Sequence, residues 1–261
     1  MAWLDRHLAT TTQPWLTTPW ILDLDATVKC LYGKQEGAVV GDNPQKPGRP
    51  SHRYHSAWMA NTRLALAVDV LPGNETAPLH RMPGIWAWLD ALPKEARPTL
   101  LRGDIAYGSE SVLHEAEARD QPYLTKLRLT KNVKALIKTL FRSNAWEEAG
   151  QGWEGVEDTL MLSGWSRTRR VIVLRRMLTG EILMTAKDDE QERFDFMERD
   201  VPTTRDEYAV LVTSTPYEIL ALAQLYRDRA DAEHNFDELK NQWGWGRVDL
   251  PSRESLAKPE S

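Results

Sequence analysis

The sequence predicts a mixed α/β sheet with interleaved helices, and three observations lead to this fold class. The first strand alternates strictly, so that Leu22 and Leu24 face one way while Asp23 and Asp25 face the other. Strand-like and helical patterns then follow one another through the first half of the chain, and the second half adds short β-prone runs between turn signals. Strands interleaved with helices are typical of a mixed α/β domain.

The elements of the first half follow in order. A stretch rich in Gly, Pro and Asn over about residues 33–50 reads as a long loop, and long loops in compact domains are often functional. The elements expected after it are strands at 55–61 and 63–71, a helix at 84–92 ended by Pro93, a strand ending at Asp104, a helix at 109–119 and a strand at 122–129. Asp104 is therefore expected at the C-terminal end of a strand, as are Asp23 and Asp25.

The pattern changes at about residue 130. A basic helix over 131–142 is followed by short strand-like runs with turn signals between them, which predicts a β-rich insertion. The β-prone stretch 208–212 then leads into a helix. We expect Thr215 to be its N-cap residue with Pro216 at the first helical position, and its spacing runs to about Asn241.

This last helix carries an unusual stripe, formed by Tyr226, Arg229, Glu233 and Lys240 at offsets of 3, 4 and 7. At about 100° per residue, these offsets place the four side chains within an arc of about 60°. A purely structural stripe would be apolar, so this helix stripe indicates a functional face. Arg229 and Glu233 also have the i,i+4 spacing of an ordinary surface ion pair, which is the simpler alternative.

Composition narrows the function classes. The chain has 261 residues and a formal net charge of -5, so binding of nucleic acid would have to rely on local basic patches. Two acid-free basic stretches, 123–142 and 159–180, meet that need, and we expect at least one to contact DNA, with Trp146, Trp153 and Trp165 able to stack on bases. With a single cysteine, no signal peptide and no run of about 20 apolar residues, a cytoplasmic protein without membrane contact is expected.

Three acids far apart in the sequence are candidates for a metal site. Asp25 and Asp104 lie at or near strand ends and Glu233 lies on the helix stripe, and we call the three the acidic triad. Hard Mg²⁺ or Mn²⁺ ions prefer carboxylate oxygens, and two such ions can promote cleavage of a phosphodiester. Asp23 shares a strand face with Asp25, so spacing alone leaves the choice between them open.

The helix stripe resembles the Tyr-x2-Arg-x3-Glu-x6-Lys signature of DDE transposases encoded by bacterial insertion sequences. The segment DLDAT at residues 23–27 resembles the surroundings of the first catalytic aspartate in one branch of that superfamily, and RGD at 102–104 resembles those of the second. The likeness covers residues 20–246 in the same order. It also favours Asp25 over Asp23, because the family has Asp-x-Thr at this place.

The resemblance implies a ribonuclease-H-like fold interrupted by a β-rich insertion, and metal-dependent DNA strand cleavage and strand transfer at transposon ends. The implied parts are residues 1–129 (first part of the catalytic domain), 130–205 (insertion), 206–246 (final strand and glutamate helix) and 247–261 (divergent tail). The acidic triad would bind two Mg²⁺ or Mn²⁺ ions. Arg229 and Lys240 would hold DNA phosphates, Tyr226 would contact a phosphate or stack nearby, and a homo-oligomer is expected on DNA.

The sequence departs from the family pattern at both of its ends. About 20 residues precede the first strand and 15 follow Gly246, whereas family members have further regions there, so a truncated copy is expected. Two other functions stay open. One is a metal-dependent nuclease of the same fold, and the other is a non-catalytic DNA-binding transposase remnant.

Overall fold

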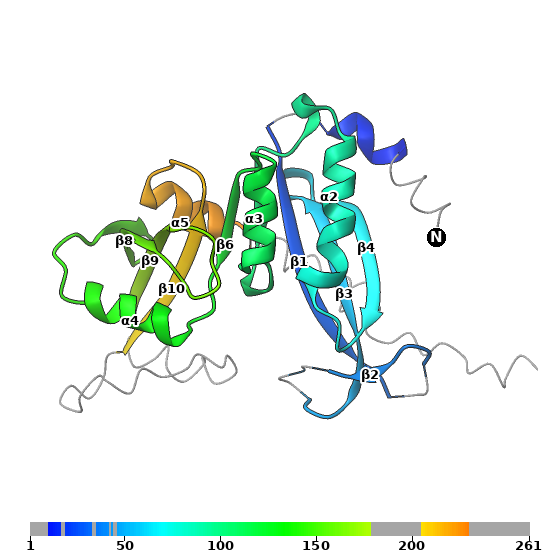
Figure 1. The fold of residues 1–261 in the computed structure, drawn as a ribbon, viewed down its shortest axis with the longest axis horizontal. Helices are drawn as coiled ribbons and strands as arrows, with labels where there is room; N and C mark the ends of the chain where they lie inside the picture. The colour runs from blue at the N-terminus through cyan, green and yellow to red at the C-terminus, as the bar shows by residue number, and fades with distance from the viewer. Residues whose placement is uncertain are drawn as a thin grey trace, which may run out of the picture.

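A computed structural model describes residues 10–16, 19–32, 35–41, 43, 46–178 and 205–229 of the chain. Its strands form one mixed sheet, in the order β2-β3-β1-β5-β6-β10-β9-β8-β7, with β4 paired to β3 beside this path (Figure 1). Helices cover both faces of the sheet. The mixed α/β fold class predicted from the sequence is confirmed.

Apart from the two-residue strand β2, the first half of the chain supplies five strands. These are β1 (Ile21–Cys30), β3 (Pro50–Met59), β4 (Leu64–Pro72), β5 (Leu100–Gly103) and β6 (Tyr123–Lys126). The first three pair antiparallel, whereas β5 lies parallel to β1 and β6 lies parallel to β5. The resulting order β4-β3-β1-β5-β6, with three antiparallel strands followed by two parallel ones, is the ribonuclease-H-like arrangement.

The second half extends the same sheet. It contributes β7 (Glu147–Gly150), β8 (Trp153–Leu160), β9 (Arg169–Leu178) and β10 (Arg205–Thr213), while the short β2 (Val39–Val40) pairs with β3. Strand β10 lies antiparallel between β6 and β9, and therefore joins the strands of the predicted insertion to the first five. The domain boundaries stay a prediction.

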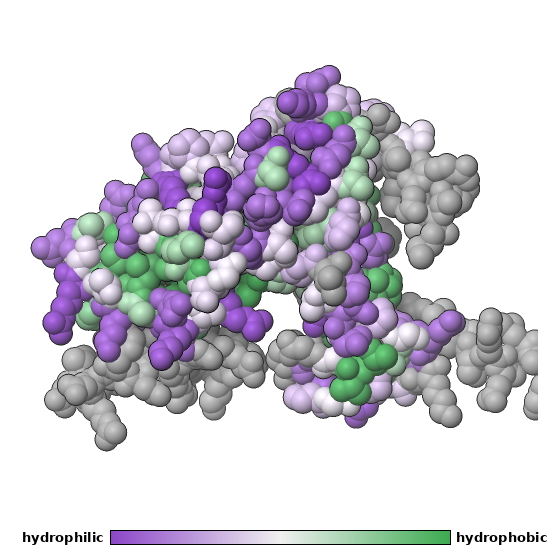
Figure 2. All heavy atoms as spheres, viewed as in Figure 1, coloured by the Kyte–Doolittle hydropathy of each residue, from purple (hydrophilic) through white to green (hydrophobic). Residues whose placement is uncertain are grey.

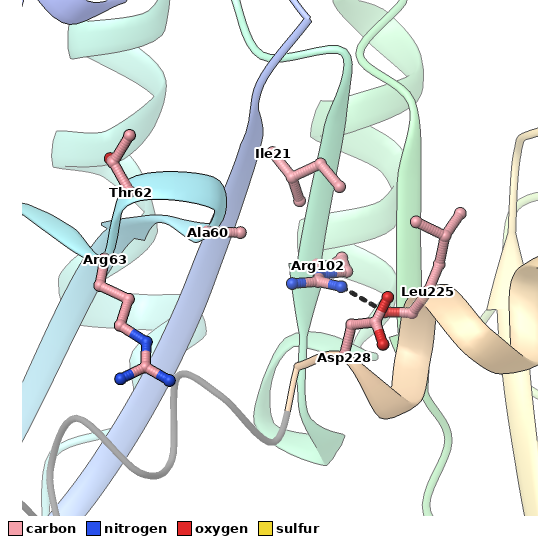
Figure 3. Close-up of a pocket in the computed structure, with 7 residues that line it drawn as sticks. All are labelled: Ile21, Ala60, Thr62, Arg63, Arg102, Leu225 and Asp228. Atoms are coloured by element: carbon pink, nitrogen blue, oxygen red, sulfur yellow. Dashed lines mark hydrogen bonds between the residues drawn. The ribbon is translucent and has the colours of Figure 1, made fainter.

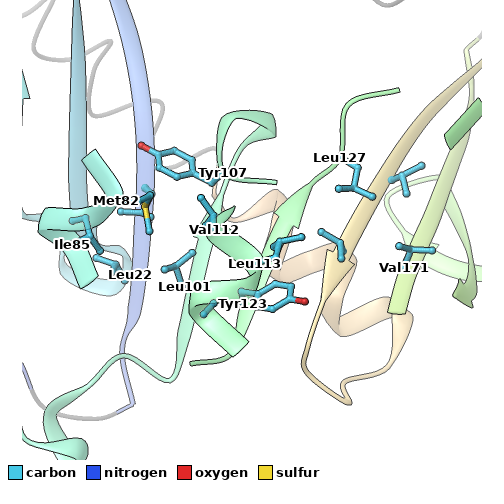
Figure 4. Close-up of a cluster of buried hydrophobic side chains, with 14 of the residues drawn as sticks. Leu22, Met82, Ile85, Leu101, Tyr107, Val112, Leu113, Tyr123, Leu127 and Val171 are labelled. Atoms are coloured by element: carbon cyan, nitrogen blue, oxygen red, sulfur yellow. The ribbon is translucent and has the colours of Figure 1, made fainter. Parts of the chain in front are cut away.

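The two faces of the sheet bury different clusters. Helices α2 (Met82–Ala91), α3 (Glu110–Ala118) and α4 (Lys131–Leu140) share one face, where Leu22 and Leu24 pack into the larger core cluster. Figure 4 shows Leu22, Met82 and Tyr107 gathered beside β1. Helix α5 (Ile219–Arg227) covers the other face with a smaller cluster around Leu222. The outer surface over α2 and α3 is mostly hydrophilic (Figure 2).

The alternation in β1 sets the direction of its acids. Because Leu22 and Leu24 enter the core under α2 and α3, Asp23 and Asp25 point to the opposite face, on which α5 lies. Both aspartates are nevertheless buried. Buried carboxylates require partners, and the arrangement of those partners defines the candidate site.

The predicted start of the last helix is wrong. Helix α5 begins at Ile219 with Glu218 as its N-cap residue, rather than at Thr215. The carbonyl oxygens of Thr215 and Tyr217 accept hydrogen bonds from the guanidinium of Arg170, at 2.6 and 2.9 Å. These carbonyls would have to accept helical N–H groups if the helix began earlier, so the contact with β9 delays its start.

The continuous helix expected up to about Asn241 is also not found over the part that the structure describes. Helix α5 ends at Arg227, and Asp228 and Arg229 form a turn. The Arg229 N–H donates to the carbonyl of Tyr226 at 3.2 Å, which is the tighter i→i−3 bond of a helix end. Residues 230–241 lie outside the described residues. In the described part, no helix is both long and apolar enough to cross a membrane.

Candidate functional site

Two acids of the triad come next to each other where β5 ends beside the middle of β1. Asp25 was expected near a strand end, but β1 continues to Cys30 in its pairing with β3, so only Asp104 directly follows the end of a strand. In the parallel pair of β1 and β5, Asp23 lies opposite Arg102 and Leu24 lies opposite Gly103. Asp25 and Asp104 are the next residues on the two chains. Neighbouring strands lie about 4.8 Å apart, so this register brings the backbones of the two acids side by side.

Tyr107 also places both acids around one point. Its side chain is fully buried, and its hydroxyl donates to the carbonyl oxygen of Asp25 at 3.4 Å. Burial raises the pKa of the Tyr107 phenol, and the negative charges of Asp104 and Asp25 raise it further. Tyr107 thus lies in the short turn capped by Asp104 and reaches the backbone of Asp25 through its hydroxyl.

The turn after β5 fixes Asp104. Its Oδ1 accepts the backbone N–H of Ala106 at 2.9 Å, so Asp104 caps the short helix η5 (Ile105–Tyr107). Gly103 makes this turn possible, since a Cβ atom there would lie 2.7 Å from the Tyr107 Cβ and 2.9 Å from its ring. Glycine at position 103 therefore lets Tyr107 pack directly against the strand end that carries Asp104.

The substitution Gly103→Ala is expected to destabilise the protein by about 1–3 kcal/mol, because the added methyl must displace the buried Tyr107. The same displacement should shift Asp104 and lower any activity of the site. Thermal melting and a DNA cleavage assay measure the two effects. Gly84→Ala in α2 is the matched control, since the nearest atom to its added Cβ is 3.7 Å away. Equal melting temperatures for the two variants would contradict the proposed packing.

Asp23 has a different role from Asp25. Its two carboxylate oxygens accept Nε and Nη2 of Arg102, each at 2.6 Å, and both side chains are buried. A second arm of Arg102 donates to the carbonyl oxygen of Leu225 near the end of α5 (Figure 3). Arg102 thus joins β1, β5 and α5, and sequence patterns gave no sign of this role.

A cavity of about 370 Å³ opens beside Arg102 (Figure 3). Its lining comes from β1, the short helix η2 (Ala60–Thr62), β5 and the end of α5. The lining residues are Ile21, Ala60, Thr62, Arg63, Arg102, Leu225 and Asp228. Ile21 begins β1, so the cavity lies toward the start of this strand, before the position of Asp25. Neither Asp25 nor Asp104 lines it.

Arg229 contacts the acid site directly. Its Nη2 donates to Asp25 Oδ1 at 2.9 Å, across 204 residues of sequence. Arg229 is 5% exposed and Asp25 is 6% exposed. The reading of Arg229 as a member of an ordinary surface ion pair is therefore wrong. The turn that ends α5 carries this guanidinium inward to the first aspartate.

The rest of the helix stripe is only partly described. Tyr226 lies in the last turn of α5, half-buried against the smaller core cluster. Glu233 and Lys240 lie outside the described residues. The structure thus brings together Asp25, Asp104 and Arg229, while the placement of Glu233 and Lys240 stays a prediction.

The arginines of the second basic stretch have acidic partners in the fold. Four of them pair with glutamates of other elements: Arg169 with Glu110 and Glu117, Arg170 with Glu157, Arg175 with Glu154, and Arg176 with Glu207. Three also cover the tryptophans proposed to stack on bases: Arg175 over Trp146, Arg176 over Trp153 and Arg169 over Trp165. These contacts hold the insertion strands together, so the stretch is not an open basic surface.

The donors of the site fit a divalent cation. Asp25 and Asp104 offer hard carboxylate oxygens at the end of β5, and Mg²⁺ is commonly bound by one or two carboxylates together with substrate phosphates. Within the described ranges, no group of three or more His, Cys, Asp or Glu side chains could hold a metal ion. A third protein ligand would have to come from elsewhere in the chain, as predicted for Glu233.

Comparison with known proteins gives one family match. A family model described as "Transposase DDE domain" matches residues 16–258. No curated protein matches the chain. A solved structure that it resembles is the cryo-EM structure of a piggyBac transposase synaptic complex with hairpin DNA, at 12% identity and a TM-score of 0.46. The match covers 85% of this chain and 40% of that one.

Proposed function

Because the chain belongs to the transposase DDE domain family, we propose that it is a DNA transposase catalytic domain that cleaves strands at transposon ends and transfers them to target DNA. The observation that carries the proposal is the register of β1 against β5, in which Asp25 and Asp104 are the residues that follow the last pair, Leu24 and Gly103. Both residues belong to motifs that resemble the family's catalytic segments. Their placement on parallel neighbouring strands supports that assignment.

We assign two Mg²⁺ or Mn²⁺ ions to Asp25, Asp104 and Glu233. Such ions, when bound, activate a water or a DNA hydroxyl and stabilise the leaving oxygen of a phosphodiester. The protein contributes the positions of the oxygen ligands. The Asp104 carboxylate is oriented by the hydrogen bond with which it caps η5. The Asp25 carbonyl accepts a hydrogen bond from the Tyr107 hydroxyl, and the Asp25 carboxylate accepts one from Arg229.

Arg229, Lys240 and Tyr226 are the proposed DNA-contacting residues of the helix stripe. The position of Arg229 supports this role, since its guanidinium lies one hydrogen bond from a catalytic carboxylate. A guanidinium can bind a carboxylate and a phosphate through different N–H groups. Arg229 would then hold the phosphate next to the cleaved bond, and we expect the protein to act as a homo-oligomer on DNA.

The test is a strand-nicking and strand-transfer assay with Mg²⁺ or Mn²⁺ on DNA that carries the element's own ends. Glu233→Gln should abolish both products, because the amide is a weaker metal ligand than the carboxylate. Glu95→Gln, on the exposed η4 turn (Lys94–Ala96), is the control and should retain activity. Undiminished activity of Glu233→Gln would overturn the metal assignment. Cut products without joined products would indicate a nuclease instead.

A further inference from the structure

We propose that Tyr32, Lys46 and Arg49, here called the loop cluster, form a second DNA-binding site. This site would bind the phosphodiester backbone at a distance from the acidic triad. The inference rests on the proposed function. The cluster lies on the long loop between β1 and β3 that the sequence predicts, and long loops in compact domains are often functional. None of its members belongs to the acidic triad or to the helix stripe.

The two cations gather on one exposed ring. The guanidinium carbon of Arg49 lies 4.8 Å from the centroid of the Tyr32 ring, and the Lys46 ammonium lies 5.1 Å from it. Lys46 also donates a hydrogen bond to the Tyr32 hydroxyl. Tyr32 is 68% exposed and both cations are exposed. Stacking on the ring thus limits the freedom of two positive charges while leaving them open to solvent.

Hydrogen bonds inside the loop hold this arrangement in place. Asn43 is buried, its side-chain amide donates to the Cys30 sulfur at 2.8 Å, and its Oδ1 accepts the Lys46 N–H at 3.2 Å. A turn follows, in which the Arg49 N–H donates to the Lys46 carbonyl at 3.3 Å. The loop therefore presents both cations from a backbone anchored to the end of β1. Preorganisation of this kind lowers the entropy cost of binding.

The contacts of the cluster differ from those of four arginines in the second basic stretch. In the part of the chain that the structure describes, Lys46 and Arg49 contact Tyr32, whereas Arg169, Arg170, Arg175 and Arg176 all contact glutamates. Two exposed cations gathered on one ring, in a chain with a net charge of -5, form the kind of local patch that nucleic-acid binding requires here.

The position of the cluster fits one continuous DNA path. The loop follows the C-terminal end of β1, and because β1 and β5 are parallel it lies beyond the acids in the direction in which Asp104 follows β5 (Figure 1). From Asp25 to the end of the strand at Cys30 the chain advances five residues, or about 17 Å. At 3.4 Å per nucleotide, this corresponds to about five nucleotides of duplex. The cluster would contact phosphates about half a helical turn from the cleaved bond.

The experiment measures how the affinity of the full chain for a 40-bp duplex depends on salt, for the wild type and for Lys46→Gln/Arg49→Gln. Each lost phosphate contact should reduce the slope of log K against log salt by about 0.9, so the double variant should lose about 1.8. The control Lys94→Gln/Arg97→Gln removes the same charge at η4, before β5 and hence at the opposite sheet edge, and should leave the slope unchanged. Lys46→Arg/Arg49→Lys keeps both charges and should restore it.

The outcomes separate this inference from the proposed function. Suppose that the wild type binds DNA and that the loop variant and the control variant have equal slopes of log K against log salt. This result would reject the second DNA-binding site and leave the transposase proposal intact. Failure of the wild type to bind duplex DNA would overturn both. Circular dichroism melts of all variants establish that the compared chains are folded. A slope that falls equally in both double variants would assign the effect to net charge and also reject the loop site.

Discussion

Asp25→Asn and Asp104→Asn are each expected to lower DNA strand cleavage by about 10³-fold. A metal ion bound at the reacting phosphate supplies several kcal/mol of transition-state stabilisation, and a loss of about 4 kcal/mol corresponds to that factor. An amide keeps the size of the side chain while it removes the negative charge on which metal binding depends. The measurement is the initial rate of nicking at saturating Mg²⁺, with element-end DNA as substrate.

The control for these variants is Asp90→Asn. Asp90 lies in α2, is exposed, and pairs with Arg119, so its substitution should change neither the nicking rate nor the fold appreciably. Thermal melts of all three variants distinguish lost chemistry from lost structure, which matters for Asp25 because it pairs with the buried Arg229. Retention of nicking by folded Asp25→Asn would show that this acid does not hold the metal.

Asp23→Ala is expected to destabilise the fold by about 3–5 kcal/mol, because it leaves the buried Arg102 guanidinium without its carboxylate partner. For a chain of this size such a loss lowers the melting temperature by roughly 10 °C. Differential scanning calorimetry measures the change. Asp90→Ala removes an exposed ion pair and should cost about 1 kcal/mol or less.

The double variant Asp23→Leu/Arg102→Met sharpens this test. An apolar pair of similar volume avoids burying an unpaired charge, so it should recover much of the stability lost in Asp23→Ala. If Asp23→Ala lowered the free energy of unfolding no more than Asp90→Ala does, the buried pair of Asp23 and Arg102 would not stabilise the fold as its geometry indicates. A metal role for Asp23 would instead appear as loss of cleavage in molecules that remain folded.

The local patterns of the sequence were sufficient for the fold class. Alternation in β1 follows from the side-chain period of a strand, and it correctly separated Leu22 and Leu24 from the two aspartates. The start of α5 was missed because it depends on Arg170, which lies 45 residues upstream of Thr215 and is brought there only by the pairing of β9 with β10. Local capping signals carry no information about such a contact.

The sequence predicted which residue types form the candidate site. It did not predict which side chains these residues contact. Spacing could not separate Asp23 from Asp25, since both leave the same face of β1. The register of β1 against β5 distinguishes them, because it places Arg102 opposite Asp23 and Asp104 beside Asp25. That register joins segments 79 residues apart. The contact between Arg229 and Asp25 is likewise set by a turn at the end of α5, where helical periodicity predicted a continuing helix.

The pairing of Asp25 with Arg229 also has a consequence for the order of events during synthesis. The two residues are separated by 204 positions, and ribosomes add about 5–20 residues per second, so Arg229 is made roughly 10–40 s after Asp25. Until then the first strand can meet β3 and β5 but not the group that binds its acid. Formation of the Asp25–Arg229 pair is therefore a late event in the life of the nascent chain.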